Sequence, residues 1–356
     1  MKKINNNLPR GGAEWGRALR RFLSDNIVPI MFVLICAYCI PRADLSWNYL
    51  LNEGMTRLGR NAFLILSLLI PVMAGMGMNF GMTLGAMAGQ IGLIFAADWQ
   101  VWGIPGLILA ASYMIAFAMD GVYQFFVLFM MGPVIPIIHN TLKLPRGYGI
   151  RNTVSLLNMR QSLDNLLAVS VGGVKIPVLT LIIIAAACLF ILWFRRTKLG
   201  QDMRAVGQDM EVARDAGINV ERTRVISMVI STVFAGFGMI IYLQNVGNFP
   251  TYTAHTQIGM FSIAALLVGG ASVEKASIKN VFLGVILFHT MFIVAPRTGT
   301  VITGDSMIGE YFRVFVSYAV ITIALVMYEA KKRKAKSAAG LQLAADQLAE
   351  EEAKAK

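Results

Sequence analysis

Two long stretches of the chain, residues 61–97 and 225–273, contain no Asp, Glu, Lys or Arg. An α-helix needs roughly 20 mainly apolar residues to cross a hydrocarbon core of about 30 Å, and both stretches exceed that length. Residues 61–97 are too long for a single crossing, and Gly75, Gly77 and Gly81 predict a break near the middle. These stretches therefore predict a helical membrane protein that crosses the bilayer several times.

The composition and the remaining apolar windows extend this prediction to most of the chain. Apolar residues make up 56% of the chain and charged residues 15%, whereas soluble domains carry roughly 25% charge. The mean hydropathy is +0.62. The further windows are residues 26–41, 99–119, 121–142, 177–194, 280–296 and 314–328, while 225–273 divides into 225–249 and 258–273. We expect an all-α polytopic membrane bundle of about ten transmembrane helices.

Basic residues gather beside the apolar windows and give the chain a net charge of +12. They lie at residues 2–21, 195–198 and 331–336, and Lys and Arg that flank spans indicate the cytoplasmic side. We therefore expect both termini in the cytoplasm. The predicted division is a cytoplasmic segment at 1–25, a transmembrane domain at 26–330 and a cytoplasmic tail at 331–356. Nucleic acid is not an expected partner, because a contiguous basic face with interleaved aromatic residues is missing.

A polar segment of mixed charge, residues 204–224, lies between two of the apolar windows. Asp209 is suited to cap the N-terminus of a short helix, Glu211 suits the positive end of that helix, and Gly217 suits its C-terminal turn. Met210, Ala213 and Ala216 would share one face, which a groove on a partner could receive. The alternative is a solvated surface helix between two spans. A simple connection between spans would not need so long a segment.

This segment resembles the cytoplasmic coupling helix of the permease subunits of bacterial ABC importers. The pattern A-[IV]-G-x-[ND]-x-x-[AV]-A-R-x-[SA]-G-I-N-V of that family is met by residues 205–220. The resemblance is to the ribose/galactose/nucleoside branch, and the wider family includes the branched-chain amino acid permeases. It implies a type II importer permease whose coupling helix, at about 204–217, docks on a separate ATP-hydrolysing subunit. The residues expected to carry this contact are Ala205, Gly207, Asp209, Glu211, Ala213, Arg214, Gly217 and Ile218.

Three further segments are similar to the same permeases, so that the resemblance covers most of residues 60–336. Residues 77–90 are similar to a glycine-containing segment between the second and third spans of the family, and residues 311–336 to its last span. Residues 266–277 are similar to a late cytoplasmic turn, but a charged Glu274–Ser277 replaces the usual second pair of glycines. This departure weakens the assignment to a subfamily more than the assignment of the fold.

Polar residues within the apolar windows are candidates for the translocation pathway. The candidates are Asn79, Thr83, Gln90, Gln244, Asn245 and Asn248. The glycines at positions 77, 81, 85 and 89 recur every four residues, which is typical of close helix packing, while Asn79, Thr83 and Gln90 face the other way. Hydrogen bonding between helices and contact with a solute are both open interpretations of these polar side chains.

The absence of buried charge guides the expected substrate. Asp120 is the one acidic residue between long apolar runs, whereas an ion-driven carrier more often places an acidic residue within a span. The expected solute is therefore neutral and hydroxylated: a simple sugar of the ribose or galactose type, or a nucleoside. The alternatives are a branched-chain amino acid permease and a secondary carrier or channel that works without a motor.

Enzymatic signatures are missing from the sequence. The three histidines are isolated, without metal-ligand spacing, and the phosphate loop GxxxxGK[ST] is absent. The chain is therefore predicted to be a transport subunit that binds no metal or cofactor, while its partner uses the ATP.

A basic loop on the predicted outer side, residues 141–176, suggests a docking surface for an acidic partner. The expected partner is a periplasmic or lipid-anchored solute-binding protein, and the alternative is a solvated loop. The candidate docking residues are Arg146, Arg151, Arg160, Arg297 and Glu310. The resemblance also implies a second permease copy or a paralogue, so that two permeases in the lipid membrane form one pathway.

Overall fold

The computed structural model describes residues 26–101, 103–119, 153–156, 167–251, 253–272, 275–305 and 307–315, together with isolated residues elsewhere. Several predicted segments lie wholly or largely outside the described residues. They are the N-terminal segment 1–25, the apolar windows 121–142 and 314–328, and the tail 331–356.

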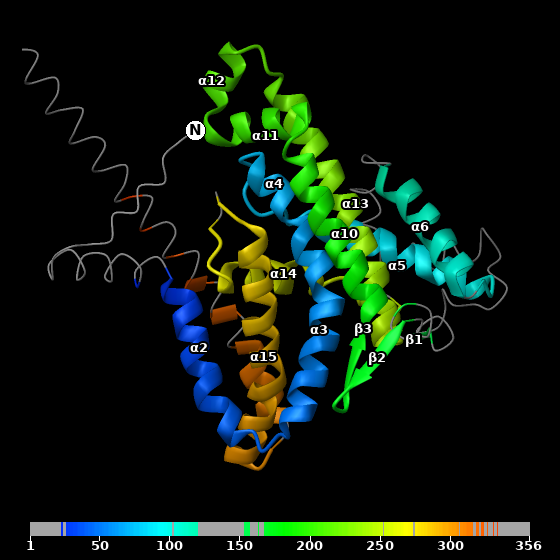
Figure 1. Ribbon diagram of the computed structural model, residues 1–356, viewed down its shortest axis with the longest axis vertical. Coiled ribbons are helices and arrows are strands. Elements are labelled where there is room, and N and C mark those ends of the chain that lie inside the picture. Colours follow the sequence, from blue (N-terminus) through cyan, green and yellow to red (C-terminus); the bar gives the residue numbers. More distant parts are fainter. Residues whose placement is uncertain are drawn as a thin grey trace, which may run out of the picture.

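The described part of the chain is mostly helical. The helices are α2 (Ile27–Cys39), α3 (Trp47–Ser67), α4 (Leu69–Met73), α5 (Met82–Asp98), α6 (Gly103–Met119), α10 (Val178–Phe194), α11 (Lys198–Gln208), α12 (Met210–Asp215), α13 (Val220–Val246), α14 (Ile258–Val268) and α15 (Ile278–Thr303), with the 3-10 helix η1 (Ile40–Arg42). Helices α2, α3, α10, α13 and α15 run roughly along the long axis, and α11 and α12 lie at one end of it (Figure 1).

Three helices are long and apolar enough to cross a membrane: the α3–α4 unit Trp47–Met73, α13 and α15. A fourth span results if α10 and α11, which meet at a bend of 74°, count together. The shorter apolar helices in the described part of the chain are Ile27–Arg42, Met82–Asp98, Gly103–Ile115 and Ile258–Val268. The chain is therefore a multi-pass helical membrane protein, and the number of about ten spans stays a prediction.

The predicted break within residues 61–97 is confirmed. Helix α4 ends at Met73, α5 begins at Met82, and residues 74–81 between them are not helical. Gly75 and Gly77 have φ angles of +70° and +77°, which residues with a side chain rarely adopt. Two glycines thus allow the chain to leave one helix and start another without a long loop.

Two small antiparallel sheets depart from the all-α prediction. Strand β1 (Thr153–Ser155) pairs with β4 (Asn248–Pro250), and β2 (Ala168–Val171) pairs with β3 (Val174–Pro177). The β2–β3 hairpin turns at Gly172 and Gly173, both with positive φ, as a two-residue hairpin loop requires. The hairpin lies beside α3, where the backbone N–H of Lys175 donates to Asn52 Oδ1 at 3.1 Å.

Helix α5 is the buried centre of the bundle, because nearly all of its residues are enclosed by the neighbouring helices. It packs against α13 through its glycines. A Cβ atom on Gly85 would overlap the carbonyl oxygen of Thr232, and one on Gly89 would lie 2.5 Å from the carbonyl oxygen of Gly236. The packing interpretation of the glycine repeat is therefore confirmed for these two positions.

This contact predicts different outcomes for two glycine-to-alanine substitutions. Gly85→Ala should destabilise the protein by about 1–3 kcal/mol, because the added methyl group forces α5 away from α13. Gly54→Ala in α3 is the matched control, since no described atom lies within 4 Å of the added methyl group, and alanine favours a helix by about 1 kcal/mol. Thermal unfolding of the purified variants in detergent measures both effects. Equal melting temperatures for the two variants would contradict the packing of α5 on α13.

Candidate functional site

The polar segment between α10 and α13 folds as two helices rather than one. Helix α11 ends at Gln208, and α12 begins after Asp209, whose Oδ1 accepts hydrogen bonds from the N–H groups of Glu211 at 2.9 Å and Val212 at 3.2 Å. Gly217, after α12, has a φ of +81°. The predicted cap and C-terminal turn are confirmed, and they hold α12 at the extreme end of the molecule (Figure 1).

The predicted docking face of α12 needs a correction. Ala213 is 2% exposed and packs with Val206 and Val220, whereas Met210 and Ala216 are exposed. Ala213 therefore belongs to the inner face of this segment and does not share a face with the other two. In a helix of six residues the sequence does not indicate which side the rest of the protein covers. The exposed residues of α12 and of the turn directly after it are Met210, Glu211, Val212, Arg214, Asp215, Ala216 and Gly217.

Helix α11 lies directly on the break between α4 and α5. A Cβ atom on Gly207 would overlap the carbonyl oxygen of Met73, and the Cα of Gly207 lies 2.8 Å from the Cβ position of Gly75. Ala205 and Ile218 are partly buried against the cluster of Val206, Ala213 and Val220. Of the predicted coupling residues, Gly207 thus attaches the segment to the bundle, whereas Ala205 and Ile218 pack within the segment.

Asn79 ties the break to two long helices. Its Nδ2 donates to Ser231 Oγ at 2.9 Å, and the Ser231 hydroxyl donates to the carbonyl oxygen of Ser67 at 2.9 Å. All three residues are buried. Thr83 at the start of α5 is partly buried, and its hydroxyl donates to the carbonyl oxygen of Phe80 at 2.9 Å. For Asn79, hydrogen bonding between helices is the interpretation that the geometry favours.

Gln90 in α5 holds the connection between α13 and α14. Its Nε2 donates to the carbonyl oxygens of Thr251 at 2.6 Å and Pro250 at 3.1 Å, and its Oε1 lies 2.9 Å from Nδ1 of His255. Burial lowers the pKa of His255, which lies in the connection and outside the spanning helices. The ring is therefore neutral near pH 7, and its Nδ1–H donates to Gln90. Gln90, like Asn79, therefore joins two segments of the protein. Its amide oxygen and nitrogen are both used in these hydrogen bonds and are not free to contact a solute.

The three candidates near the end of α13 differ in their surroundings. Gln244 is 1% exposed, and neither its Nε2 nor its Oε1 has a hydrogen-bond partner among the described residues. Asn245 is also buried, and its Oδ1 accepts a hydrogen bond from Arg60 Nη1 at 3.5 Å. Asn248 is exposed in β4 and lines a cavity of about 350 Å³ together with Tyr242 and Phe249. The structure does not gather all six candidates into one cluster.

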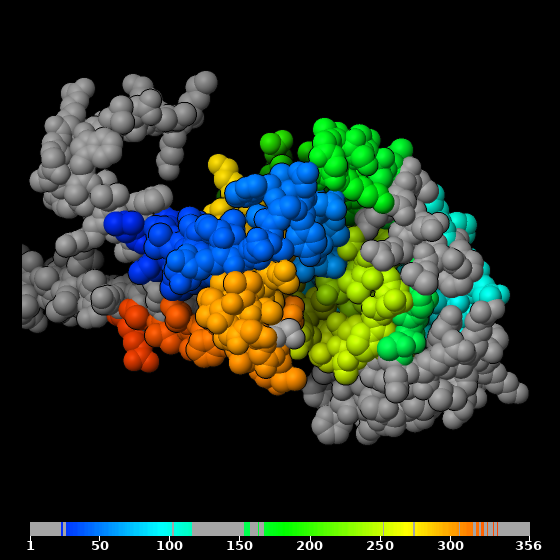
Figure 2. Space-filling view, turned by 90° about the horizontal axis from the view of Figure 1, so that it is seen from below, coloured from blue at the N-terminus to red at the C-terminus, as the bar shows by residue number. Residues whose placement is uncertain are grey.

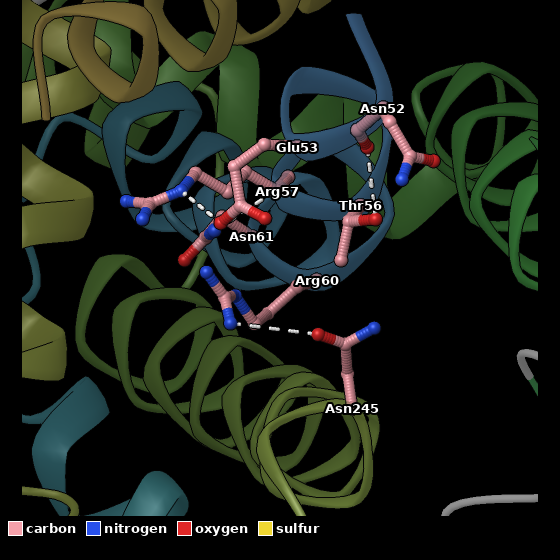
Figure 3. A network of polar contacts seen from close by, with 7 residues as sticks. All are labelled: Asn52, Glu53, Thr56, Arg57, Arg60, Asn61 and Asn245. Carbon is pink, nitrogen blue, oxygen red and sulfur yellow. Dashed lines mark hydrogen bonds and ion pairs between the residues drawn. The ribbon is translucent and has the colours of Figure 1, made fainter. Parts of the chain in front are cut away.

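A row of charged and amide side chains on α3 was missed by the sequence analysis (Figure 3). Arg57 Nε pairs with Glu53 Oε1 at 2.8 Å, and Asn61 Nδ2 donates to the carbonyl oxygen of Arg57 at 2.8 Å. Arg60 reaches across to α13, where it contacts Asn245 and lies 5.5 Å from the ring centroid of Tyr242.

Arg60 lies at the middle of its span. It is thirteen residues from either end of Trp47–Met73, which corresponds to about 20 Å of helix on each side. Arg60 is partly buried and lies just outside the expected apolar window, which was taken to begin at residue 61. The spacing of Glu53, Arg57 and Arg60 places the three on one helical face, and this periodicity was the available signal.

The predicted docking residues are only partly described. Arg146, Arg151 and Arg160 lie outside the described residues. Arg297 and Glu310 line a cavity of about 550 Å³ that Arg57 and Arg313 also line, and Arg313 Nη2 pairs with Glu310 Oε2 at 2.6 Å. This cavity lies between α3 and the end of α15, which are neighbours at the end of the molecule opposite α12 (Figure 2).

Comparison with known proteins identifies the family. Residues 45–325 match the family described as branched-chain amino acid transport system / permease component. The chain belongs to this family. It is 26% identical to the nucleoside ABC transporter permease protein NupB of Lactococcus lactis subsp. cremoris (strain MG1363), over 72% of this chain and 64% of NupB. No solved structure matches the chain.

Two further relatives have been named for other solutes. The chain is 27% identical to the autoinducer 2 import system permease protein LsrC of Enterobacter sp. (strain 638), over 75% of this chain and 76% of LsrC. It is 26% identical to the galactose/methyl galactoside import permease protein MglC of Haemophilus influenzae (strain ATCC 51907 / DSM 11121 / KW20 / Rd), over 47% of each chain. The chain spans less than two thirds of NupB and about half of MglC. Membership in this family makes the chain a permease component of a transport system.

Because Ala213 is buried and Val212 is exposed, glutamate should have opposite effects on stability at these two positions of α12. Ala213→Glu should destabilise the protein by about 2 kcal/mol or more, because it places a carboxylate among Val206 and Val220. Val212→Glu should leave the melting temperature unchanged, because Val212 is 64% exposed. Thermal unfolding in detergent and the yield of monodisperse protein compare the two. A normal melting temperature for Ala213→Glu would show that this residue faces outward after all.

Proposed function

We propose that this chain is the transmembrane permease subunit of an ATP-driven ABC importer that moves a simple sugar or a nucleoside across the cytoplasmic membrane. The family match over residues 45–325 and the names of three relatives support this proposal. The observation that carries it is the α11–α12 segment, a capped helix pair that is exposed at its tip and fixed to the bundle at its base.

In this proposal α12 is the coupling helix and contacts a separate ATPase subunit. The exposed Met210 and Val212 form the contact, since apolar side chains at the tip of a polar segment suit a groove on a partner. Movement of α12 passes through Gly207 of α11 to Gly75, and so to the junction of α4 and α5. Gly207 and Gly75 transmit a displacement directly, because no flexible side chain separates the two backbones.

The orientation follows from the basic residues at the same end. Arg195, Arg196 and Lys198 connect α10 to α11, so this end faces the cytoplasm. About ten spans with both termini in the cytoplasm complete the bundle, and a second copy or a paralogue pairs with it. The solute-binding protein docks at the opposite end, where Arg297 and Glu310 line the cavity of about 550 Å³.

The pathway in this proposal passes the polar cluster of Arg60, Asn245 and Gln244. Gln244, a buried amide without a hydrogen-bond partner among the described residues, and the guanidinium of Arg60 are suited to exchange hydrogen bonds with the hydroxyl groups of a solute. Arg57 pairs with Glu53, while Arg60 points to α13, where it contacts Asn245 and Tyr242.

A branched-chain amino acid is the second candidate substrate. The family carries this description, and the guanidinium of Arg60 could pair with a carboxylate. Sugars and nucleosides are favoured because NupB and MglC are named for them.

The coupling role of α12 predicts the effect of one exposed substitution. The test reconstitutes the permease with its ATPase subunit and binding protein in proteoliposomes. Val212→Glu should reduce both ATP-dependent uptake and stimulation of ATP hydrolysis by the loaded binding protein by about tenfold or more, because a carboxylate cannot enter an apolar groove without losing its hydration. Val212→Thr keeps the shape of the side chain and should retain most of both activities. Full coupled uptake by Val212→Glu would remove α12 from the ATPase contact.

The proposed role of Arg60 predicts that its substitution impairs transport but not assembly of the transporter. Arg60→Gln should lower the ratio of kcat to KM for uptake by about 10- to 100-fold, since a hydrogen bond to a charged group contributes roughly 1.5–3 kcal/mol. Arg42→Gln is the control, because Arg42 is exposed at the end of α2 and stacks on Tyr38. Labelled adenosine, galactose and leucine are the test solutes. Normal uptake by Arg60→Gln would exclude this cluster from the pathway, and uptake of leucine alone would favour the amino acid alternative.

A further inference from the structure

A cavity of about 500 Å³ lies where α4, α10 and α11 meet the turn that precedes α15. Three basic side chains line it, and they come from three separate segments: Arg195 from the end of α10, Arg204 from α11 and Lys275 from the turn. Among the described residues that line this cavity none is acidic. The described lining of the cavity therefore carries a net positive charge.

Aliphatic side chains line the same cavity. They are Leu69, Ile191 and Ile278, from the start of α4, from α10 and from the first turn of α15. A cavity lined by both basic and aliphatic side chains suits a ligand that carries a phosphate group next to hydrocarbon. A small inorganic anion would use only the basic side chains.

The level of the cavity along the bundle agrees with the surface of the bilayer. Trp193, two residues before Arg195, is 61% exposed, and tryptophan is enriched where a helix leaves the hydrocarbon for the headgroup region. Arg196 and Lys198 follow directly. The spanning helix α10 thus ends at this level, and Arg195, the first basic residue after it, lines the cavity.

We propose that this cavity binds a phosphate group through Arg195, Arg204 and Lys275, and that an anionic phospholipid of the inner leaflet supplies it. Arginine forms paired hydrogen bonds with phosphate oxygens, and basic pockets between spans at the cytoplasmic surface bind anionic headgroups. Leu69, Ile191 and Ile278 receive the upper part of the acyl chains.

A lipid at this position would connect the coupling segment to the bundle. Arg204 lies on α11 one turn before Gly207, which touches the α4–α5 junction, whereas Arg195 and Lys275 belong to the neighbouring segments. The phosphate would bridge these three segments across the bend of 74° between α10 and α11. Anionic lipid should therefore stabilise the orientation of α11, independently of which solute the protein carries.

The experiment uses the full-length protein, delipidated in detergent, and measures lipid binding by native mass spectrometry. The probes are phosphatidylglycerol, phosphatidylcholine and inorganic phosphate. The cavity variant combines Arg195→Gln, Arg204→Gln and Lys275→Gln. The matched control combines Arg196→Gln, Lys198→Gln and Arg214→Gln, which remove three exposed charges from the same end of the molecule without lining the cavity.

We expect wild-type protein to bind phosphatidylglycerol more tightly than phosphatidylcholine by about tenfold or more. The cavity variant should lose this preference, whereas the control variant should keep it. Equal losses in both variants would overturn the site, because general surface charge would then explain the binding. If inorganic phosphate stabilised the wild type as much as phosphatidylglycerol does, the proposal that a lipid supplies the phosphate group would be overturned. Thermal unfolding of each variant shows whether a loss of binding results from misfolding. The single variant Arg204→Gln is measured in the same way, because it changes the cavity least.

Discussion

The close contact between α5 and α13 is the interaction on which the rest of the bundle depends. Lipid tails are as apolar as leucine, so burial of apolar area does not drive helices together within a membrane, and close packing of small residues does. At Gly85 and Gly89 the backbone of α5 lies directly on that of α13. Gly92 makes the same kind of contact with Ala110 of α6, so that α5 joins α6 to α13. Helix α5 is enclosed because its neighbours can approach it this closely.

Once α5 is fixed, its start and its middle each hold a neighbouring segment. At its start, the break at residues 74–81 carries Asn79, which joins Ser231 of α13, and Gly75, which supports Gly207 of α11. At its middle, Gln90 holds the connection after β4. Displacement of the α11–α12 segment therefore acts at the start of a helix that packs against α13 and α6. This arrangement explains why polar residues predicted for the pathway, such as Asn79 and Gln90, instead bond to neighbouring segments. A buried helix that packs through glycines needs such hydrogen bonds to fix its position along its neighbours.

The sequence predicted those features that depend on neighbouring residues in the chain. The break at Gly75 and Gly77 and the cap at Asp209 require only a few adjacent residues, and both are present as predicted. The inward position of Ala213 could not be predicted, because it depends on where Val206 and Val220 lie in the folded chain. The β2–β3 hairpin lay in a region interpreted as a loop, although its Gly172–Gly173 turn was a usable signal. The sugar and nucleoside branch was recognised from the motif at residues 205–220, and the relatives agree with it.

The position of Arg60 shows why charge alone is a poor guide to where a span begins. From Asn61 to Val72 the α3–α4 unit is buried throughout, whereas most residues from Asn52 to Arg60 are only partly buried. A guanidinium in contact with hydrocarbon would be expensive, and the cost falls when the side chain faces other polar groups or water. The partly buried half carries Glu53, Arg57 and Arg60 on one face, and the buried half carries none, so one helix combines a polar outer half with an apolar inner half. The change occurs at Arg60, and its contact with Asn245 places the last charged group of α3 against α13, the helix that also packs on α5. The polar outer half of α3 and the glycine-packed core therefore meet on a single helix, α13, whose Ser231 also bonds Asn79 in the break that supports α11.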